Sequence, residues 1–133
     1  DLNFYQTIKT LCNAREVVED GGTIILVTKS QEGYGSPDTQ KQIAGYSTMV
    51  DREKALRENF SIGAFIGYLF AECAETHHMI VVTSMKQEEF GTARIHAVQT
   101  LDEALALSRE LNGGRDLRAT LLPHGANTLP KFQ

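Results

Sequence analysis

The stretch Thr23-Ile24-Ile25-Leu26-Val27-Thr28 is a nearly continuous run of apolar and β-branched residues. Such a run is typical of a strand that is buried on both faces, as the strands of parallel sheets are. Before it, residues 4–19 carry apolar side chains at spacings of three, four and seven, which predicts a helix that ends before Gly21. A helix followed by a buried strand favours an α/β fold.

The middle of the chain predicts three more helices. Residues 38–59 are polar and predict two helical pieces, with a break near Gly45. The charged run at residues 51–54 reads as a solvated helix face. Ser61 is a candidate N-cap for an apolar helix that continues to Cys73.

Further strands alternate with these helices. Apolar runs predict strands at residues 79–83, 94–98 and 117–122, and Thr100 begins a capping box that predicts a helix between the last two. The alternation predicts a single α/β domain over residues 1–133, with a Rossmann-like, mostly parallel sheet of about four strands and helices on both faces.

Length and composition exclude several classes of protein. The chain has 133 residues, which fits one domain, and a formal net charge of -4. Without a run of lysine and arginine, the charge argues against a nucleic-acid surface. No apolar run reaches the roughly 20 residues that a membrane span needs, and no signal peptide is recognisable, so we expect a cytoplasmic protein. Because the chain starts at Asp1 just before a helix, we expect a fragment whose upstream part was removed.

Cysteine and histidine residues do not form a metal-binding pattern. Cys12 and Cys73 lie among apolar residues, so we expect buried free thiols. His77 and His78 are adjacent at the start of a strand and point to opposite faces, which argues against a shared metal ion. His96 lies in an apolar strand and reads as a core residue. We therefore expect no metal and no cofactor on this domain alone.

The first helix carries the candidate binding residues. Asn3 can cap it, and Gln6 can complete a capping box three residues later. Tyr5 and Lys9 are four residues apart and share a face with Gln6, so a phenol, an amide and an ammonium group point outward. A helix N-terminus itself favours anions. The alternative is an ordinary cap, an aromatic anchor and a solvated lysine.

Two loops are predicted to lie beside this face. The segment Lys29–Pro37 follows the first strand and is rich in glycine and serine, and the tail at residues 124–128 contains His124. A helix that feeds a parallel strand begins at the carboxyl edge of the sheet, where α/β folds bind ligands. We therefore predict that Tyr5, Gln6, Lys9 and His124 converge there, although both loops could also be plain connections.

Common catalytic motifs are missing from the sequence. It contains no glycine-rich nucleotide fingerprint, no P-loop lysine, and no serine or cysteine nucleophile in a recognisable motif. His124 is the better candidate for proton transfer among the histidines. The chain can supply donors for an anion, but the reactive groups of any enzyme must come from elsewhere.

Four segments resemble the C-terminal domain of the nickel-pincer lactate racemases and their relatives. The family's Tyr-Gln-x-x-Lys helix corresponds to residues 1–9, and the strand and loop with Glu-Gly-Tyr-Gly correspond to residues 21–35. The other two segments are residues 100–105 and 122–130. The likeness covers nearly the whole chain in the same order.

This resemblance implies that the chain is the C-terminal half of a two-domain protein, and it implies a function for that full-length protein. Family members interconvert stereoisomers of 2-hydroxy acids, and their nickel-pincer nucleotide accepts hydride from the substrate carbon and returns it. The N-terminal domain supplies the cofactor and the acid/base histidines, and the C-terminal domain closes the cleft. Carried over to this chain, Gln6 and Lys9 would act as catalytic residues that hold the substrate, while Tyr5 would line the same pocket.

The chain departs from the family at one place. Relatives often have a His-Lys pair where this sequence has Phe65-Ile66, which leaves open whether the substrate is lactate, another 2-hydroxy acid or a polyhydroxy acid. Two other readings stay open. The chain could be a non-catalytic α/β module that binds a small anion, or an interaction domain that uses the apolar helix Ile62–Cys73 as its interface. A homo-oligomer is also compatible with that apolar helix.

Overall fold

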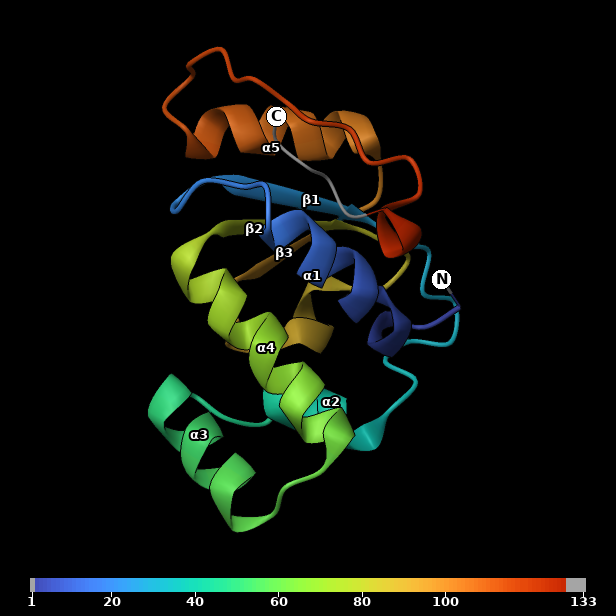
Figure 1. The fold of residues 1–133 in the computed structure, drawn as a ribbon, viewed down its shortest axis with the longest axis vertical. Coiled ribbons are helices and arrows are strands. Elements are labelled where there is room, and N and C mark those ends of the chain that lie inside the picture. The colour runs from blue at the N-terminus through green and yellow to red at the C-terminus, as the bar shows by residue number, and fades with distance from the viewer. Residues whose placement is uncertain (1, 129–133) are drawn as a thin grey trace.

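The computed structural model describes residues 2–128, and Figure 1 shows its fold. Its centre is a three-stranded parallel sheet with the order β1-β2-β3. The strands are β1 (Thr23–Val27), β2 (His78–Val82) and β3 (Ile95–Val98). Thr23 pairs with His78, and Met79 pairs with Ile95. The predicted parallel arrangement is therefore confirmed.

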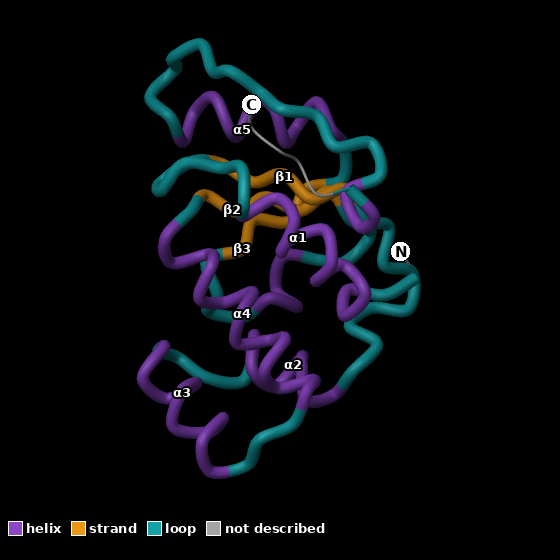
Figure 2. The backbone as a smooth tube through the Cα atoms, viewed as in Figure 1, coloured by secondary structure: helices purple, strands orange, loops and turns teal. Residues whose placement is uncertain are grey.

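Helices cover both faces of this sheet (Figures 1 and 2). α1 (Ile8–Arg15) and α4 (Ile62–Thr76) lie on one face, and α5 (Leu101–Leu111) lies on the other. α2 (Pro37–Ala44) and α3 (Met49–Glu58) extend the layer of α4 away from the sheet. Three short 3-10 helices complete the fold: η1 (Phe4–Thr7), η2 (Gln87–Phe90) and η3 (Gly125–Asn127).

The prediction of a fourth strand at residues 117–122 is wrong. In the structure this segment has no regular structure and passes over α5 on the side away from the sheet (Figure 2). Leu117 is 47% exposed and Leu121 is 83% exposed. A strand needs the open edge of a neighbouring strand for its backbone hydrogen bonds, and this path offers none.

Hydroxyl caps begin most of the helices, as the sequence indicates. Ser61 Oγ accepts from the backbone N–H of Ala64 at 3.1 Å, and Thr100 Oγ1 accepts from that of Glu103 at 3.1 Å. The Glu103 carboxylate accepts from the N–H of Gln99, one residue before the cap. Each such cap typically stabilises a helix by about 1 kcal/mol. The predicted starts of α4 and α5 are confirmed.

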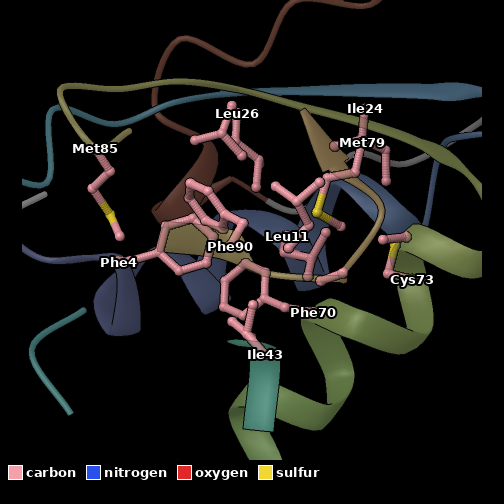
Figure 3. Packing of buried hydrophobic residues seen from close by; sticks show 14 of the residues in the cluster. Phe4, Leu11, Ile24, Leu26, Ile43, Phe70, Cys73, Met79, Met85 and Phe90 are labelled. Atoms are coloured by element: carbon pink, nitrogen blue, oxygen red, sulfur yellow. The ribbon is translucent and has the colours of Figure 1, made fainter. Parts of the chain in front are cut away.

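An aromatic cluster holds the first helix against α4 (Figure 3). The Phe4 ring lies 4.4 Å from that of Phe70 and 5.3 Å from that of Phe90, measured between ring centroids. Tyr34 packs edge-on against Phe4 at 5.9 Å. Edge-to-face and offset aromatic pairs of this kind add about 0.5–1.5 kcal/mol each beyond their buried area.

Backbone pairing also joins the first helix to the loop after β1. The N–H of Phe4 donates to the carbonyl of Gly33 at 2.8 Å, and the N–H of Tyr5 donates to that of Tyr34 at 3.0 Å. Gly35 follows with a φ of +73°, and a Cβ placed there would collide with the Asn3 side chain. The first helix and the loop therefore form one unit, and Gly35 is required by both its backbone conformation and its neighbour.

Two side chains are placed differently from the sequence-based expectation. Arg52, which reads as part of a solvated face, is only 2% exposed, because it donates to the carbonyls of Gln42, Ile43 and Tyr46. These bonds fasten α3 to the end of α2. Cys73 is buried as predicted, but the prediction that Cys12 is buried is wrong, since Cys12 is exposed.

We expect Arg52→Ala to lower the free energy of unfolding by roughly 2–4 kcal/mol, because the buried carbonyl groups of Gln42 and Ile43 and the partly buried one of Tyr46 lose their donor. Urea unfolding followed by circular dichroism measures this. The matched control is Arg57→Ala, which removes an exposed ion pair with Glu53 and should cost no more than about 0.5 kcal/mol. Equal effects of the two substitutions would contradict the structural role of Arg52.

We expect Gly35→Ala to destabilise the chain by more than about 2 kcal/mol, because a strained backbone adds to a collision with Asn3. Gly33 provides the control, since its φ is +66° but a Cβ there would meet nothing within 4 Å. Gly33→Ala should therefore show only the backbone strain of about 1 kcal/mol. Thermal unfolding of both variants would test the difference, and the same loss in each would rule out the packing of Asn3 on Gly35.

Candidate functional site

The candidate site is built on the start of the first helix. Asn3 Oδ1 accepts from the backbone N–H of Gln6 at 3.2 Å, which confirms the predicted cap. The Asn3 amide also donates to the Glu32 carboxylate at 3.4 Å. The chain winds first as the 3-10 helix η1 and then as α1. Tyr5 and Gln6 therefore lie on a short turn that its neighbours hold in place, and Lys9 follows in the first turn of α1.

Tyr5, Gln6 and Lys9 differ in how open they are. Tyr5 is half-buried and packs against the hydrophobic core, whereas Gln6 and Lys9 are exposed. Tyr5 is thus in part the aromatic anchor that the alternative interpretation proposes. The amide of Gln6 and the ammonium group of Lys9 remain available to a ligand.

The backbone N–H groups at this helix start are already used. Those of Phe4 and Tyr5 donate to loop carbonyls, and that of Gln6 donates to Asn3. An anion would otherwise be expected to bind such groups directly. Recognition at this position therefore depends on side chains, above all on the amide and ammonium donors of Gln6 and Lys9.

A chain of buried hydroxyl groups ties the helix to the end of β1. Thr7 Oγ1 donates to Thr28 Oγ1 at 3.1 Å, and Thr28 Oγ1 lies 3.0 Å from Ser30 Oγ. All three residues are 1% exposed. Ser30 has a φ of +48°, a conformation that costs a residue other than glycine about 1–2 kcal/mol. The sequence gives no sign of this chain of hydroxyl groups, because Thr7 is 21 residues away from Thr28.

The loop after β1 has its own anchor in Tyr34. The hydroxyl of Tyr34 donates to the carbonyl of Glu89 at 2.7 Å, and the residue is 5% exposed. Burial is the main cause that raises the pKa of Tyr34, and the nearby Glu89 carboxylate adds to it. The phenol therefore stays neutral and serves as a structural donor.

His124 is exposed and immediately precedes η3. This turn packs on α1, where the Asn13 side-chain amide donates to the carbonyl of Gly125 at 2.6 Å. A Cβ at Gly125 would lie 2.7 Å from the methyl group of Thr10. The first helix thus contacts both predicted loops: its start meets the loop after β1, and its later turns meet the tail. The fourth resembling segment continues past residue 128, and that part lies outside the described residues.

The remaining histidines lie at the opposite end of the sheet. His77, His78 and His96 line a shallow cavity of about 380 Å³ together with Glu75 and Arg94. His96 is half-buried, so the expectation of a core residue is wrong: β3 lies at the sheet edge and leaves its side chain partly open. Within residues 2–128, no three histidine, cysteine or acidic side chains are arranged to hold a metal ion. Over the same residues, no helix is long and apolar enough to cross a membrane.

Comparisons with known proteins match this chain to one family. The family profile of the lactate racemase C-terminal domain matches residues 1–129. The lactate racemase of Lactiplantibacillus plantarum is 27% identical to this chain over an alignment of 143 residues, gaps included. The alignment covers 98% of this chain. This chain spans only 32% of that protein, about a third of its length.

A solved structure agrees in fold. The lactate racemase apoprotein from Thermoanaerobacterium thermosaccharolyticum matches with a TM-score of 0.73 over 85% of this chain and 28% of that one. The sequence identity is 23%, so this likeness establishes the fold alone. The family profile covers nearly every residue, including the helix with Tyr5, Gln6 and Lys9. The chain therefore belongs to the family of lactate racemase C-terminal domains.

Proposed function

We propose that this chain is the C-terminal domain of a cytoplasmic 2-hydroxyacid racemase or epimerase. In this proposal it closes the active-site cleft against an N-terminal domain of the same protein and orients the substrate. The observation that carries the proposal is the position of Gln6 and Lys9, which are exposed on a fixed turn at the carboxyl edge of a parallel sheet. Ligands of α/β folds bind at that edge.

The chemistry of a 2-hydroxy acid fits these donors. Its carboxylate accepts charge-assisted hydrogen bonds, which an ammonium group such as that of Lys9 makes well. The amide of Gln6 can donate to the carboxylate or the hydroxyl group, and Tyr5 offers an aromatic wall. Since the nearby backbone N–H groups already have partners, Gln6 and Lys9 are the proposed catalytic residues that touch the substrate.

His124 is proposed as a further substrate-binding residue. It is exposed beside η3, which Asn13 and Thr10 hold on α1. A histidine changes charge near neutral pH and can contact a carboxylate or a hydroxyl group. Because η3 packs on the later turns of α1, His124 is proposed to contact the far end of a longer substrate, such as a polyhydroxy acid.

A nickel-pincer nucleotide is the proposed cofactor of the full-length protein. The described residues do not fit a metal centre, because they include no group of three suitable ligands. We therefore propose that the N-terminal domain holds this group and supplies the acid/base residues. This chain then contributes binding and orientation to the reaction.

A non-catalytic anion-binding module is the second candidate. The observation that favours it is the set of donors itself: Gln6, Lys9 and His124 are exposed, and an ammonium or amide donor binds a carboxylate without any reaction. The two candidates make the same contact and differ only in whether turnover follows.

We expect Lys9→Ala in the full-length protein to lower kcat/KM for a 2-hydroxy acid by roughly 10- to 100-fold, because a charge-assisted contact is lost. The protein is made together with its cofactor-maturation enzymes and incubated with single enantiomers of 2-hydroxy and polyhydroxy acids. Chiral chromatography follows the appearance of the other isomer. The same panel identifies the substrate.

Lys54→Ala is the matched control, since Lys54 is an exposed lysine on α3 and should leave turnover unchanged. A Lys9→Ala variant as active as the parent protein would rule out Lys9 as a substrate contact. Hydroxy-acid binding by the parent protein without isomerisation, although nickel is bound, would favour the anion-binding module.

A further inference from the structure

Exposed apolar side chains gather where α4 begins. Phe60 is 65% exposed, Ile62 is 67% exposed and Phe65 is 42% exposed. The rings of Phe60 and Phe65 lie against each other with centroids 6.1 Å apart. We call these three residues the aromatic patch. Large apolar side chains that cluster on a surface commonly mark a contact with another protein surface.

Most of α4 is committed to the domain's own core. Ile66, Phe70 and Cys73 are 8% exposed or less. Tyr68 and Leu69, one turn beyond Phe65, are half-buried. The exposed apolar side chains of α4, Ile62 and Phe65, lie in its first turn, so any interface at this helix centres on the aromatic patch.

The aromatic patch connects to the candidate site through the loop that leads from β1 to α2. α4 tilts away from the sheet towards its start, so its first turn lies beside the beginning of α2, where Ser61 Oγ donates to the Asp38 carboxylate at 2.7 Å (Figure 1). Gly63 packs against Ser36, since a Cβ at Gly63 would lie 2.6 Å from Ser36 Oγ. The preceding residue, Gly35, packs against Asn3, which caps the helix that carries Gln6. An unbroken series of contacts thus links the patch to the site.

We propose that the aromatic patch is the apolar contact through which this domain docks onto the N-terminal domain of the same protein. This inference rests on the proposed function, in which the carboxyl edge closes over a shared cleft. The matched relative is about three times as long as this chain, which leaves two thirds of such a protein to cover the edge. Leu2 is 64% exposed, and η1 follows it directly at the carboxyl edge of the sheet (Figure 1). In a longer chain, a preceding domain would therefore connect to this domain beside the candidate site.

The size of the patch favours a tethered partner over a second copy of the chain. A whole aromatic side chain buries roughly 150–250 Å², and since the three side chains of the patch are only 42–67% exposed, together they offer roughly 450 Å² at most. A stable interface between separate proteins needs about 800 Å² on each partner. A covalently linked domain needs less, because the linker raises its effective concentration to the millimolar range.

The test uses the full-length protein with Phe60→Ser and Phe65→Ser combined. The expected result is a larger radius of gyration by small-angle X-ray scattering and faster hydrogen exchange at residues 60–66. In a protein that turns over a hydroxy acid, KM should rise while unfolding stays unchanged. Val50→Ser is the matched control, since Val50 is 75% exposed on α3 outside the patch and should change neither measurement.

Unchanged scattering and exchange in the double variant would overturn the proposal. Conversion of a dimer to a monomer, with the shape of each subunit unchanged, would also overturn it and assign the patch to a second copy. Scattering and exchange need no turnover, so they report on docking even if the protein is no racemase. Conversely, a Lys9→Ala variant that is inactive but has normal scattering would support the proposed site. It would also show that docking does not depend on Lys9.

Discussion

The structure depends on the burial of Phe4. This ring is fully buried and contacts the rings of Phe70, Phe90 and Tyr34, which come from α4, η2 and the loop after β1. Burying a phenylalanine side chain contributes about 1.5–3 kcal/mol. A 3-10 turn of four residues has little stability of its own, so its position comes from packing. The side chains next to Phe4 are consequently held against the core rather than on a loose end of the chain.

This packing decides how the site can recognise a ligand. Because the loop after β1 is drawn against Phe4, its carbonyls accept the first free N–H groups of the helix. The fold thereby uses the donors that many α/β proteins offer to anions at a helix start. The exposed side-chain donors that remain at this helix start are those of Gln6 and Lys9. Because both side chains extend into solvent, replacing either of them leaves the backbone pairing of the helix start in place.

Local patterns in the sequence predict the elements that local physics determines. The β1 run, the break at Gly45 and the cap at Ser61 are correct because burial on both faces and capping act within a few residues. The strand at residues 117–122 fails because pairing depends on a free sheet edge, which no local pattern describes. Local patterns also do not predict the burial of Arg52 or the hydroxyl chain of Thr7, Thr28 and Ser30. Arg52 donates to backbone carbonyls, and Thr7 is distant in sequence from its partner Thr28. The spacing of Tyr5, Gln6 and Lys9 predicts the candidate site. Only the fold shows that the backbone N–H groups of Phe4, Tyr5 and Gln6 already have hydrogen-bond partners.

A single sheet edge sets a limit on what this domain does alone. In the proposed reaction a hydride leaves the substrate carbon and returns to it, whereas amide and ammonium groups such as those of Gln6 and Lys9 bind charge and do not exchange hydride. The first helix carries these exposed donors at one edge of the sheet. The proposal therefore assigns the reactive groups to another surface. A domain with exposed donors at one sheet edge, and an exposed aromatic patch that a loop links to them, has the features expected of one half of a cleft: in the proposed arrangement the patch would bring the surfaces together, and Gln6 and Lys9 would hold the substrate between them.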